Sequence, residues 1–388
     1  MFNAAKAKRL MIRIVDKKEC CGCTACEKRC PKGCITMVQD DEGFLYPATD
    51  VYACIECGLC ERVCPVINQG QGRVLDYVYA VKNGQEQTRL ESSSGGVFTM
   101  LAEAVIGEGG VVFGVKFNSQ FEVVHGYTEN IAGISDFRTS KYVQSFLGDC
   151  FKEVEQFLKS GRKVLFSGTP CQISGLKRFL LREYSNLLTV DVACHGVPSP
   201  KVWRDYKNRF QEHCIGRINF RDKSTGWKRF SFTIRDKEEK IIISEPLDKN
   251  VFIRGFLANI YLRPSCYYCP AKLGKSNSDI TIADLWGIDE LLPCYDDDKG
   301  VSLVLFNSER GKLYCSSVLR EYKKFDFEQV VTYNPALTTS VRCPEVSSWF
   351  WAKYPVYKTR TIEKALKKMS PNLFTKAVRK TKSLLYYK

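Results

Sequence analysis

The chain has 388 residues, 19 cysteines and a formal net charge of +15. Apolar residues make up 44% of it, which excludes global disorder, and the length allows two or three domains. No run of about 18 apolar residues occurs, so we expect no membrane-spanning helix. The first 15 residues lack an apolar stretch of signal-peptide length, which predicts a cytoplasmic protein whose reduced thiols serve metal or redox chemistry.

Eight cysteines between residues 20 and 64 form two copies of one pattern. In each copy three cysteines are spaced three residues apart, and a fourth follows four residues later, directly before a proline. In such a pattern three thiolates wrap one iron–sulfur cube and the fourth reaches the other cube. We therefore expect one [4Fe-4S] cluster on Cys20, Cys23, Cys26 and Cys64, and a second on Cys54, Cys57, Cys60 and Cys30. Zinc is the alternative, although zinc sites usually use pairs of cysteines.

This pattern resembles a bacterial two-cluster ferredoxin domain and covers residues 10–70. Two clusters in series carry electrons, so a donor and an acceptor are expected at the two ends. Cys21 and Cys34 fall outside the pattern, and we predict that they are small thiols packed beside the clusters.

Strand-like and helix-like segments alternate after a Gly- and Gln-rich linker at residues 66–76, which predicts an α/β or α+β body over residues 76–345. Strands are expected at 111–117, 163–166, 187–192, 280–283 and 301–306, helices at 149–159, 170–181 and 202–213, and two or three antiparallel strands within 218–246.

The segment at residues 163–173 runs from a buried strand through Gly168, Thr169 and Pro170 into a helix. Backbone N–H groups at the carboxyl edge of a sheet favour phosphate or a flavin. Cys171 would lie in the first helical turn, where we expect the helix dipole to lower the pKa of its thiol.

Three further cysteines, Cys194, Cys266 and Cys269, each lie beside a Gly or Pro at the end of an element. Together with Cys171 they are candidates for a third [4Fe-4S] site, and the alternative is a set of unconnected thiols with a small zinc knuckle. The remaining cysteines are predicted to be packing residues: Cys150, Cys214, Cys294, Cys315 and Cys343.

Two polar segments are candidates for ligand contact. Residues 92–96 read Ser-Ser-Ser-Gly-Gly before an apolar helix, so we expect hydroxyls to cap that helix and glycines to allow close approach. Residues 140–145 place a cation, an aromatic ring and an amide together, which suits the edge, face and rim of a flavin. A solvated loop is the alternative for residues 140–145.

The chain has three histidines, His125, His195 and His213. We predict a structural role for His125 and a surface position for His213. His195 follows Cys194, so it either donates a proton to a substrate, hydrogen-bonds near a cluster, or supports the loop.

The polar and cysteine motifs occur in one order: Ser-Ser-Gly-Gly, Ser-Lys-Tyr-Val-Gln, Gly-Thr-Pro-Cys-Gln, Cys-His-Gly-Val-Pro, Cys-Tyr-Tyr-Cys-Pro and Asp-Ile-Thr-Ile-Ala-Asp-Leu-Trp-Gly. This order resembles the family of coenzyme F420 hydrogenase/dehydrogenase β-subunits, preceded by a ferredoxin domain. The resemblance implies FAD, a [4Fe-4S] cluster near it, and an α+β fold with a larger mixed-sheet flavin-binding domain. The resemblance also implies that the ligands of the third cluster are Cys171, Cys194, Cys266 and Cys269. The candidates for the flavin site that it implies are Ser94, Gly95, Lys141, Tyr142, Gln144, Gly168, Thr169 and Gln172.

With Trp286 and with Gly226-Trp227-Lys228, the chain resembles bacterial members associated with surface-polysaccharide synthesis. Trp286 would narrow or close a deazaflavin pocket. We therefore expect an oxidoreductase, with His195 as its catalytic candidate. It would pass electrons from a ferredoxin or other redox protein through the clusters and FAD to an organic substrate, such as a sugar or a lipid-linked polysaccharide precursor. The alternatives are an electron-transfer subunit that serves a partner enzyme and a non-enzymatic iron–sulfur sensor. No nucleic-acid module is visible, so no nucleic-acid partner is expected.

Residues 353–388 form a basic tail, with eleven Lys or Arg and one acid, which is +10 of the total charge. Helical spacing of apolar residues predicts two short amphipathic pieces separated by Pro371. The tail is either solvated or attached to anionic lipid on the inner face of the membrane, where each basic residue contributes about 1 kcal/mol.

Overall fold

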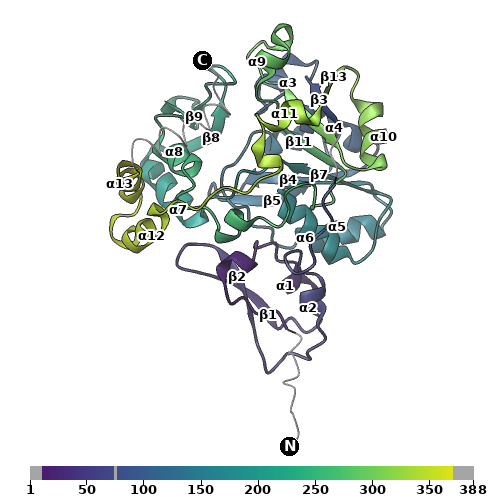
Figure 1. Ribbon diagram of the computed structural model, residues 1–388, viewed down its shortest axis with the longest axis vertical. Helices are drawn as coiled ribbons and strands as arrows, with labels where there is room; N and C mark the ends of the chain where they lie inside the picture. The colour runs from purple at the N-terminus through teal and green to yellow at the C-terminus, as the bar shows by residue number, and fades with distance from the viewer. Residues whose placement is uncertain (1–10, 74–76, 370–388) are drawn as a thin grey trace, which may run out of the picture.

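The computed structural model describes residues 11–73 and 77–369, which form a small ferredoxin-like unit below a larger body (Figure 1). The body contains two separate sheets with helices packed on them. The α+β class predicted from the sequence is therefore confirmed.

The ferredoxin-like unit contains an antiparallel pair, β1 (Ile35–Gln39) and β2 (Leu45–Thr49), and two short helices, α1 (Ala25–Arg29) and α2 (Leu59–Arg62). Each helix follows a residue in the left-handed region, Thr24 with φ 61° and Gly58 with φ 70°. The two cysteine runs therefore bend sharply just before their helices, as loops that wrap a compact group must.

The main sheet has eight strands in the order β13-β3-β12-β11-β7-β6-β4-β5. Their bounds are β3 (Tyr77–Val81), β4 (Val111–Phe117), β5 (Val123–Thr128), β6 (Val164–Gly168), β7 (Leu187–Val192), β11 (Ile280–Asp284), β12 (Ser302–Phe306) and β13 (Tyr322–Asp326). Strands β4, β6, β7 and β11 are parallel neighbours. Strand β3 has the same direction as β11, because both pair antiparallel with β12.

Helices cover both faces of this sheet. Val111 and Phe113 pack with α5 (Cys150–Lys159) and α6 (Pro170–Leu180), while Val112 packs with α4 (Val97–Gly107) and α10 (Glu309–Val318). Burial on both faces explains why the parallel strands are nearly continuous apolar runs. Three short helices, α3 (Glu86–Leu90), α9 (Ile288–Leu291) and α11 (Phe327–Val331), complete this half.

The second sheet has three antiparallel strands, β8 (Ile215–Asp222), β9 (Ser231–Asp236) and β10 (Ile241–Pro246), in the order β10-β9-β8. Helices α7 (Pro200–Lys207), α8 (Val251–Leu257), α12 (Val346–Tyr357) and α13 (Arg360–Lys368) pack with it, at the left of Figure 1. Aromatic rings fill the core, and the Trp203 and Phe220 centroids lie 4.9 Å apart. Such ring pairs stabilise a core beyond the burial of their area.

Most of the elements expected from periodicity are confirmed. The helix expected at 202–213 differs, because α7 ends at Lys207 and continues as the 3₁₀ segment η3 (Asn208–His213). The cysteines predicted to pack also divide, because Cys150 and Cys315 are buried but others are exposed. The exposed ones are Cys214, Cys294 and Cys343.

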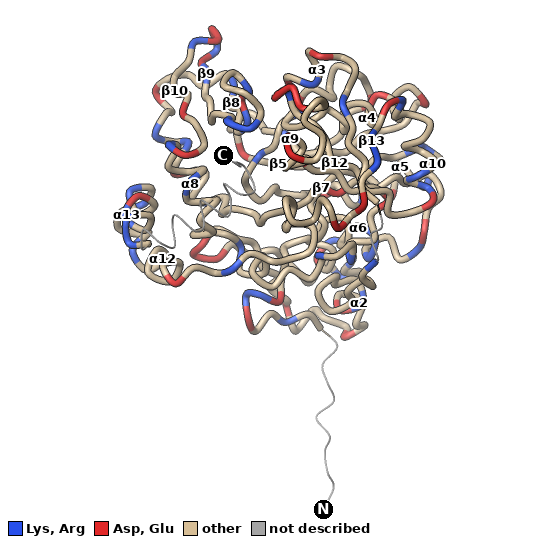
Figure 2. Tube along the Cα trace, turned by 45° about the horizontal axis from the view of Figure 1, so that its top comes forward, with Lys and Arg blue, Asp and Glu red and all other residues tan. Residues whose placement is uncertain are grey.

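The first part of the basic tail is folded onto the body. Ile362, Ala365 and Leu366 of α13 are buried in the core of the second sheet, next to α8. Several positions of α13 are Lys or Arg, which colour this helix blue in Figure 2, and Lys364, Lys367 and Lys368 are exposed. Pro371 and the second amphipathic piece lie outside the described residues. Among the described residues no helix is long and apolar enough to cross a membrane.

Candidate functional site

The first thiol set comprises Cys20, Cys23, Cys26 and Cys64, and it gathers where the loop before α1 meets the end of α2. Burial raises the pKa of Cys26, and the neighbouring Cys20 and Cys64 raise it further. The Cys64 thiol therefore lies near Cys20 and Cys26 of the other run and near Cys60 of its own run. Buried, mutually repelling thiols fit an iron–sulfur core, because ligand thiols must lose their protons and the iron compensates their charge.

The second thiol set comprises Cys30, Cys54, Cys57 and Cys60. Burial raises the pKa of Cys34, and so do the neighbouring Cys30 and Cys54 thiols, which places both of them close to Cys34. The Cys30 and Cys34 sulfurs lie 3.4 Å apart. Cys57 is exposed, so this set reaches the surface. The Cys34 thiol therefore lies next to the set, and its absence from the ligands stays a prediction.

The third thiol set comprises Cys171, Cys194, Cys266 and Cys269, and the fold brings these four together from three segments. Cys171 lies in the first turn of α6, Cys194 follows β7, and the other two belong to the 3₁₀ segment η4 (Pro264–Tyr268) and its end. Burial raises the pKa of Cys266, and Cys194 and Cys171 add repulsion.

One expectation about the third set is wrong. Contact with the Cys21 thiol and burial raise the pKa of Cys171, whereas we expected the helix dipole to lower it. Within residues 11–73 and 77–369, no three Cys, His, Asp or Glu side chains are grouped so as to hold a single metal ion. A cube distributes its four thiolates around its corners.

The first and third sets meet across Cys21. This thiol is buried in the loop of the first set, beside Cys23 and Cys171. Helix α6 also packs directly on the first set, because a Cβ added to Gly175 would lie 3.0 Å from the Cys23 sulfur. The three sets therefore follow one another in space as second, first and third.

Two buried cations lie at these sets, and the sequence analysis missed both. The side chain of Arg263 is 1% exposed and donates to the carbonyls of Cys20 (2.7 Å) and Leu45 (2.8 Å). Lys272 donates to the carbonyl of Cys194 (2.6 Å). Each lies three residues from a third-set cysteine, which is the one signal in the sequence that could have found them.

The polar loops singled out in the sequence meet at the carboxyl edge of the main sheet, to which β3, β6, β7 and β11 all point. The Ser140 N–H donates to Ser93 Oγ (2.7 Å), which joins residues 92–96 to residues 140–145. Gln172 Nε2 donates to Ser145 Oγ (2.9 Å), which adds the turn after β6. Ligands of open α/β sheets bind at such an edge.

Gly168, Thr169 and Gln172 form a rigid turn at this edge. The Thr169 N–H donates to Gln172 Oε1 (2.9 Å), and the two residues form a capping box at the start of α6. Gln172 is linked through Ser145 to His125, because Ser145 Oγ lies 2.9 Å from His125 Nδ1. The side chain of Gln172 is thus held by the protein, and the backbone of the turn is the part that suits a phosphate or flavin.

The flavin-site candidates at residues 141–144 do not share the surroundings of the turn after β6. The Lys141 ammonium donates to the carbonyls of Asp136 (2.9 Å) and Arg138 (2.7 Å), and burial lowers its pKa to about 7. Gln144 Nε2 donates to the Cys21 carbonyl (3.1 Å). These two side chains therefore fit a flavin edge less well than their residue types suggest.

Tyr142 lies between the two sheets. Its ring stacks on Phe256 at 4.8 Å, and its hydroxyl accepts from Arg221 (3.4 Å). Arg221 is buried and forms an ion pair with Asp284 (2.6 Å), and its Nε has no hydrogen-bond partner among the described residues. Arg221 is a further site residue that the sequence analysis missed, because β8 places it there from a separate sheet.

Ser94 and Gly95 are braced against β12 at the same edge. Ser94 Oγ donates to the Val301 carbonyl (2.9 Å), and the Gly95 N–H donates to Ser302 Oγ (2.9 Å). The predicted cap is wrong, because α4 begins after Gly96 in the left-handed region, φ 83°, with no side-chain cap. A hydroxyl cannot cap a helix while it binds a neighbouring strand.

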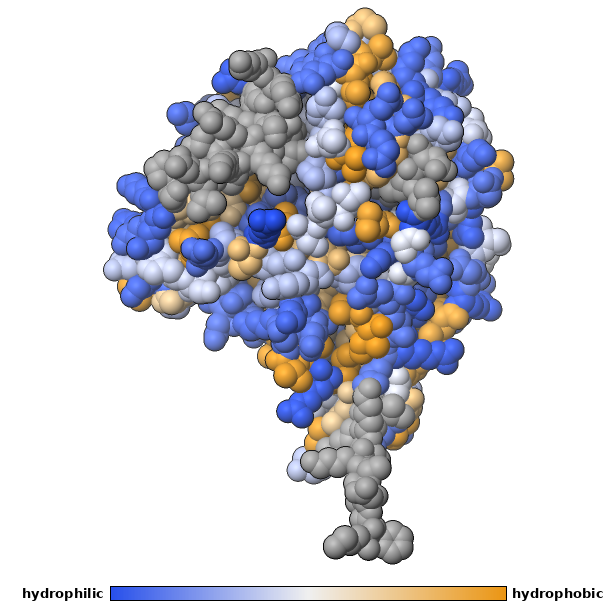
Figure 3. Space-filling view, in the orientation of Figure 1, coloured by the Kyte–Doolittle hydropathy of each residue, from blue (hydrophilic) through white to orange (hydrophobic). Residues whose placement is uncertain are grey.

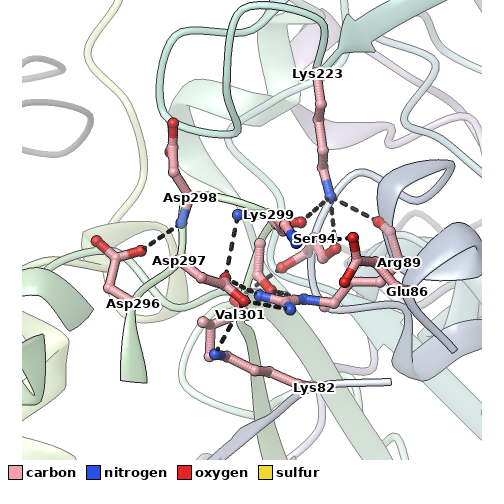
Figure 4. A network of polar contacts seen from close by, with 12 residues as sticks. Lys82, Glu86, Arg89, Ser94, Lys223, Asp296, Asp297, Asp298, Lys299 and Val301 are labelled. Carbon is pink, nitrogen blue, oxygen red and sulfur yellow. Dashed lines mark hydrogen bonds and ion pairs between the residues drawn. The ribbon is translucent and has the colours of Figure 1, made fainter. Parts of the chain in front are cut away.

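A network of charged groups holds the Ser94 loop (Figure 4). Lys223 donates to the carbonyls of Ser94 (2.8 Å) and Arg89 (2.9 Å), and Arg89 pairs with Asp297. Burial, together with the nearby Arg221, lowers the pKa of Lys223 to about 7. This network fixes the loop against the second sheet.

The histidines differ in exposure. His195 Nε2 lies 2.6 Å from Asn259 Oδ1, and its ring meets Phe256 edge-on at 5.1 Å. Burial lowers the pKa of His195 to about 4, so its ring is neutral at pH 7. His125 is buried and bonded to the protein, and His213 is exposed, as expected.

Trp286 stacks on Trp227 at 4.9 Å with nearly parallel rings. Trp227 Nε1 donates to Asp284 Oδ1 (2.8 Å), so both indoles are fixed beside the Arg221–Asp284 pair. The Trp pair thus forms an aromatic wall at the carboxyl end of β11.

A ferredoxin-type cysteine unit packed on an α+β body with a third group of thiols defines an iron–sulfur electron-transfer protein. Residues 161–330 match the family model that describes the C terminus of the beta subunit of coenzyme F420 hydrogenase/dehydrogenase. Over these residues the chain is similar to the β-subunits of F420 hydrogenases and dehydrogenases.

Two curated proteins are similar to parts of the chain. The chain is 23% identical over 193 residues to the F subunit of F420H2 dehydrogenase from Methanosarcina mazei, covering 47% of this chain and 54% of the relative. Over 52 residues it is 42% identical to an uncharacterized ferredoxin of Methanocaldococcus jannaschii, covering 13% of this chain and 66% of the relative. The chain therefore spans about half the length of the dehydrogenase subunit and about two thirds of the length of the ferredoxin.

A chain of the F420-reducing [NiFe] hydrogenase complex from Methanosarcina barkeri is similar in structure, with a TM-score of 0.46 and 15% identity. The similarity covers 77% of this chain and 93% of that chain.

Proposed function

We propose that this chain is an iron–sulfur flavoprotein oxidoreductase. It takes single electrons from a ferredoxin or another redox protein and delivers them in pairs to an organic substrate. The observation that carries the proposal is the order of the thiol sets, because the second set reaches the surface and Cys21 joins the first set to the third. The third set in turn lies at the sheet edge where the polar loops meet.

The residues that would hold three [4Fe-4S] clusters are the twelve cysteines of the three sets. FAD, when bound, supplies the conversion between one-electron and two-electron transfer. The parts of the chain that suit it are the backbone at Ser94–Gly95 and Gly168–Thr169, and the Tyr142 ring beside Arg221. Lys141, Gln144 and Gln172 would act by fixing these loops, because their polar groups are bonded to the protein.

The electron donor would dock at the second set. Tyr52 is 98% exposed and Ile55 56% exposed, on the same loop as the exposed Cys57. Apolar side chains also appear among polar ones on the lower end of the molecule (Figure 3). An apolar surface beside a cluster ligand suits a brief contact with a redox protein.

Anaerobic purification with iron, sulfide and flavin quantified tests this function. About 12 iron atoms and one FAD per chain would support the proposal, and about eight iron atoms without flavin would contradict it.

A second candidate function is an electron-transfer subunit without its own substrate. It is favoured by the similarity to one subunit of a dehydrogenase. The purified chain should be mixed with reduced ferredoxin and either an oxidised deazaflavin or a nucleotide-linked sugar. Oxidation of two ferredoxins for each substrate reduced supports the enzyme. Cluster reduction without turnover, restored by a partner protein, supports the electron-transfer role.

We also propose contact with an anionic membrane through α12 and α13. Val356, in the last turn of α12, is 73% exposed, and six exposed cations lie on these two helices and the turn that joins them: Lys353, Lys358, Arg360, Lys364, Lys367 and Lys368. Co-sedimentation with phosphatidylglycerol vesicles should exceed that with phosphatidylcholine vesicles. It should fall in the variant Lys358→Glu/Lys364→Glu and persist in Lys312→Glu, which changes an exposed residue of α10.

A further inference from the structure

Arg263 joins the ferredoxin-like unit to the body at the point where the first and third thiol sets meet. Its guanidinium donates to two carbonyls of the ferredoxin-like unit, those of Cys20 and Leu45, and to Gln144 Oε1 of the body (3.0 Å). Gln144 in turn donates to the Cys21 carbonyl. A planar fork with five N–H groups can serve three acceptors at once, whereas an ammonium acts as a point charge.

The charge of Arg263 has an unusual environment. The side chain is buried over the rings of Tyr46 (4.4 Å) and Phe44 (5.4 Å), and no carboxylate among the described residues forms an ion pair with it. A buried charge without a partner is costly. Three thiols are among the groups near it that can become negative, and Arg263 Nη2 lies 3.5 Å from the Cys20 sulfur.

Gly22 gives independent evidence that this approach is built into the chain. Its φ is +72°, and a Cβ there would lie 2.7 Å from Arg263 Nη1 and 2.8 Å from Gln144 Nε2. A side chain at position 22 would therefore push the guanidinium away from the cysteine loop. Glycine satisfies both the backbone conformation and the close contact.

We infer that Arg263 is a positioning residue that locks the first thiol set against the third and raises the reduction potential of the cluster held by the first set. This inference rests on the proposed iron–sulfur function. Reduction adds negative charge next to a fixed, desolvated cation, so Arg263 stabilises the reduced form. The N–H contact to the Cys20 sulfur acts in the same direction.

The test is a redox titration of the full chain, purified anaerobically, followed by electron paramagnetic resonance. Arg263→Met removes the charge and the donors, and Arg263→Lys keeps the charge but reaches fewer acceptors. Arg217→Met is the matched control, because it removes one exposed arginine from β8. In Arg263→Met one cluster signal should move to lower potential, so that its oxidised-to-reduced ratio at the wild-type midpoint rises about tenfold, or about 59 mV.

We expect Arg263→Lys to shift less and Arg217→Met not at all. Unchanged midpoints in an Arg263→Met protein with wild-type iron content would overturn the inference. If Arg263→Met loses iron, the variant Gln144→Leu decides, because it keeps Arg263 but removes one acceptor that holds the guanidinium. Unchanged midpoints in Gln144→Leu would overturn the inference equally. Failure of the proposed function is separate, since it would appear as missing iron or flavin in the wild-type protein.

Discussion

The thiol of Cys21 lies beside the thiol of Cys171, and this contact joins the ferredoxin-like unit to the edge of the main sheet. Cys21 belongs to the loop of the first set, and Cys171 opens α6. Cys21 is buried and Cys171 is half-buried, and α6 packs against the first set at Gly175. The two redox groups proposed here would therefore be neighbours without a protein layer between them.

The first prediction separates a ligand from its neighbour across this contact. Cys171→Ala should lower the iron content from about 12 to about 8 atoms per chain, because the third cluster loses a thiolate. Cys21→Ala is the matched control and should retain about 12, because Cys21 lies outside the ligand pattern. Iron and acid-labile sulfide assays measure both. Equal loss in the two variants would show that Cys21 is itself a ligand.

The second prediction applies the same comparison to the second set. Cys57→Ala should remove about four iron atoms, since Cys57 is a proposed ligand at the exposed end of this cluster. Cys34→Ala should leave the iron content unchanged, although its sulfur lies 3.4 Å from that of Cys30. The same assays apply. Iron loss in Cys34→Ala with retention in Cys57→Ala would mean that Cys34 is the fourth ligand.

The two ferredoxin-type sets could be predicted from the sequence because their geometry is local. Three cysteines in seven residues must share one loop, and only one partner is drawn from the other run. The third set depends on how β7, α6 and η4 approach one another, which spacing cannot encode. Arg263 was missed for the same reason, since its acceptors Cys20 and Leu45 belong to a different unit.

The sheet edge shows a different limit of sequence reasoning. Residue type alone makes Lys141 and Gln144 suitable for a flavin, but the fold bonds Lys141 to backbone carbonyls and Gln144 to the cysteine loop. The pKa of Cys171 is a similar case. The helix dipole favours a thiolate there, but contact with Cys21 and burial outweigh it.

The third prediction concerns acid stability and His125. Burial lowers the pKa of His125 from 6.5 to about 4, so between these pH values the unfolded chain binds more protons than the folded chain. The free energy of unfolding should therefore fall as the pH decreases from 6.5 to 4, by up to about 3 kcal/mol from this residue. Chemical unfolding of the loaded protein at several pH values measures the slope.

In His125→Asn the whole chain should be less stable at pH 7, because the ring stacked on Phe166 is lost, but its stability should fall less between pH 6.5 and 4. His213→Asn, at an exposed position, should retain the wild-type slope. An identical slope in wild type and His125→Asn would exclude His125 as a source of the acid sensitivity.

The fourth prediction tests whether the start of the basic tail belongs to the folded body. Leu366 of α13 is buried in the core of the second sheet, so Leu366→Ala should lower the free energy of unfolding by about 2–4 kcal/mol, through lost burial and a cavity. Lys367→Ala, at the neighbouring exposed position, should change it by less than about 0.5 kcal/mol. Denaturant unfolding of both variants measures the difference. If neither substitution alters the free energy of unfolding, α13 is detached from α8 in solution.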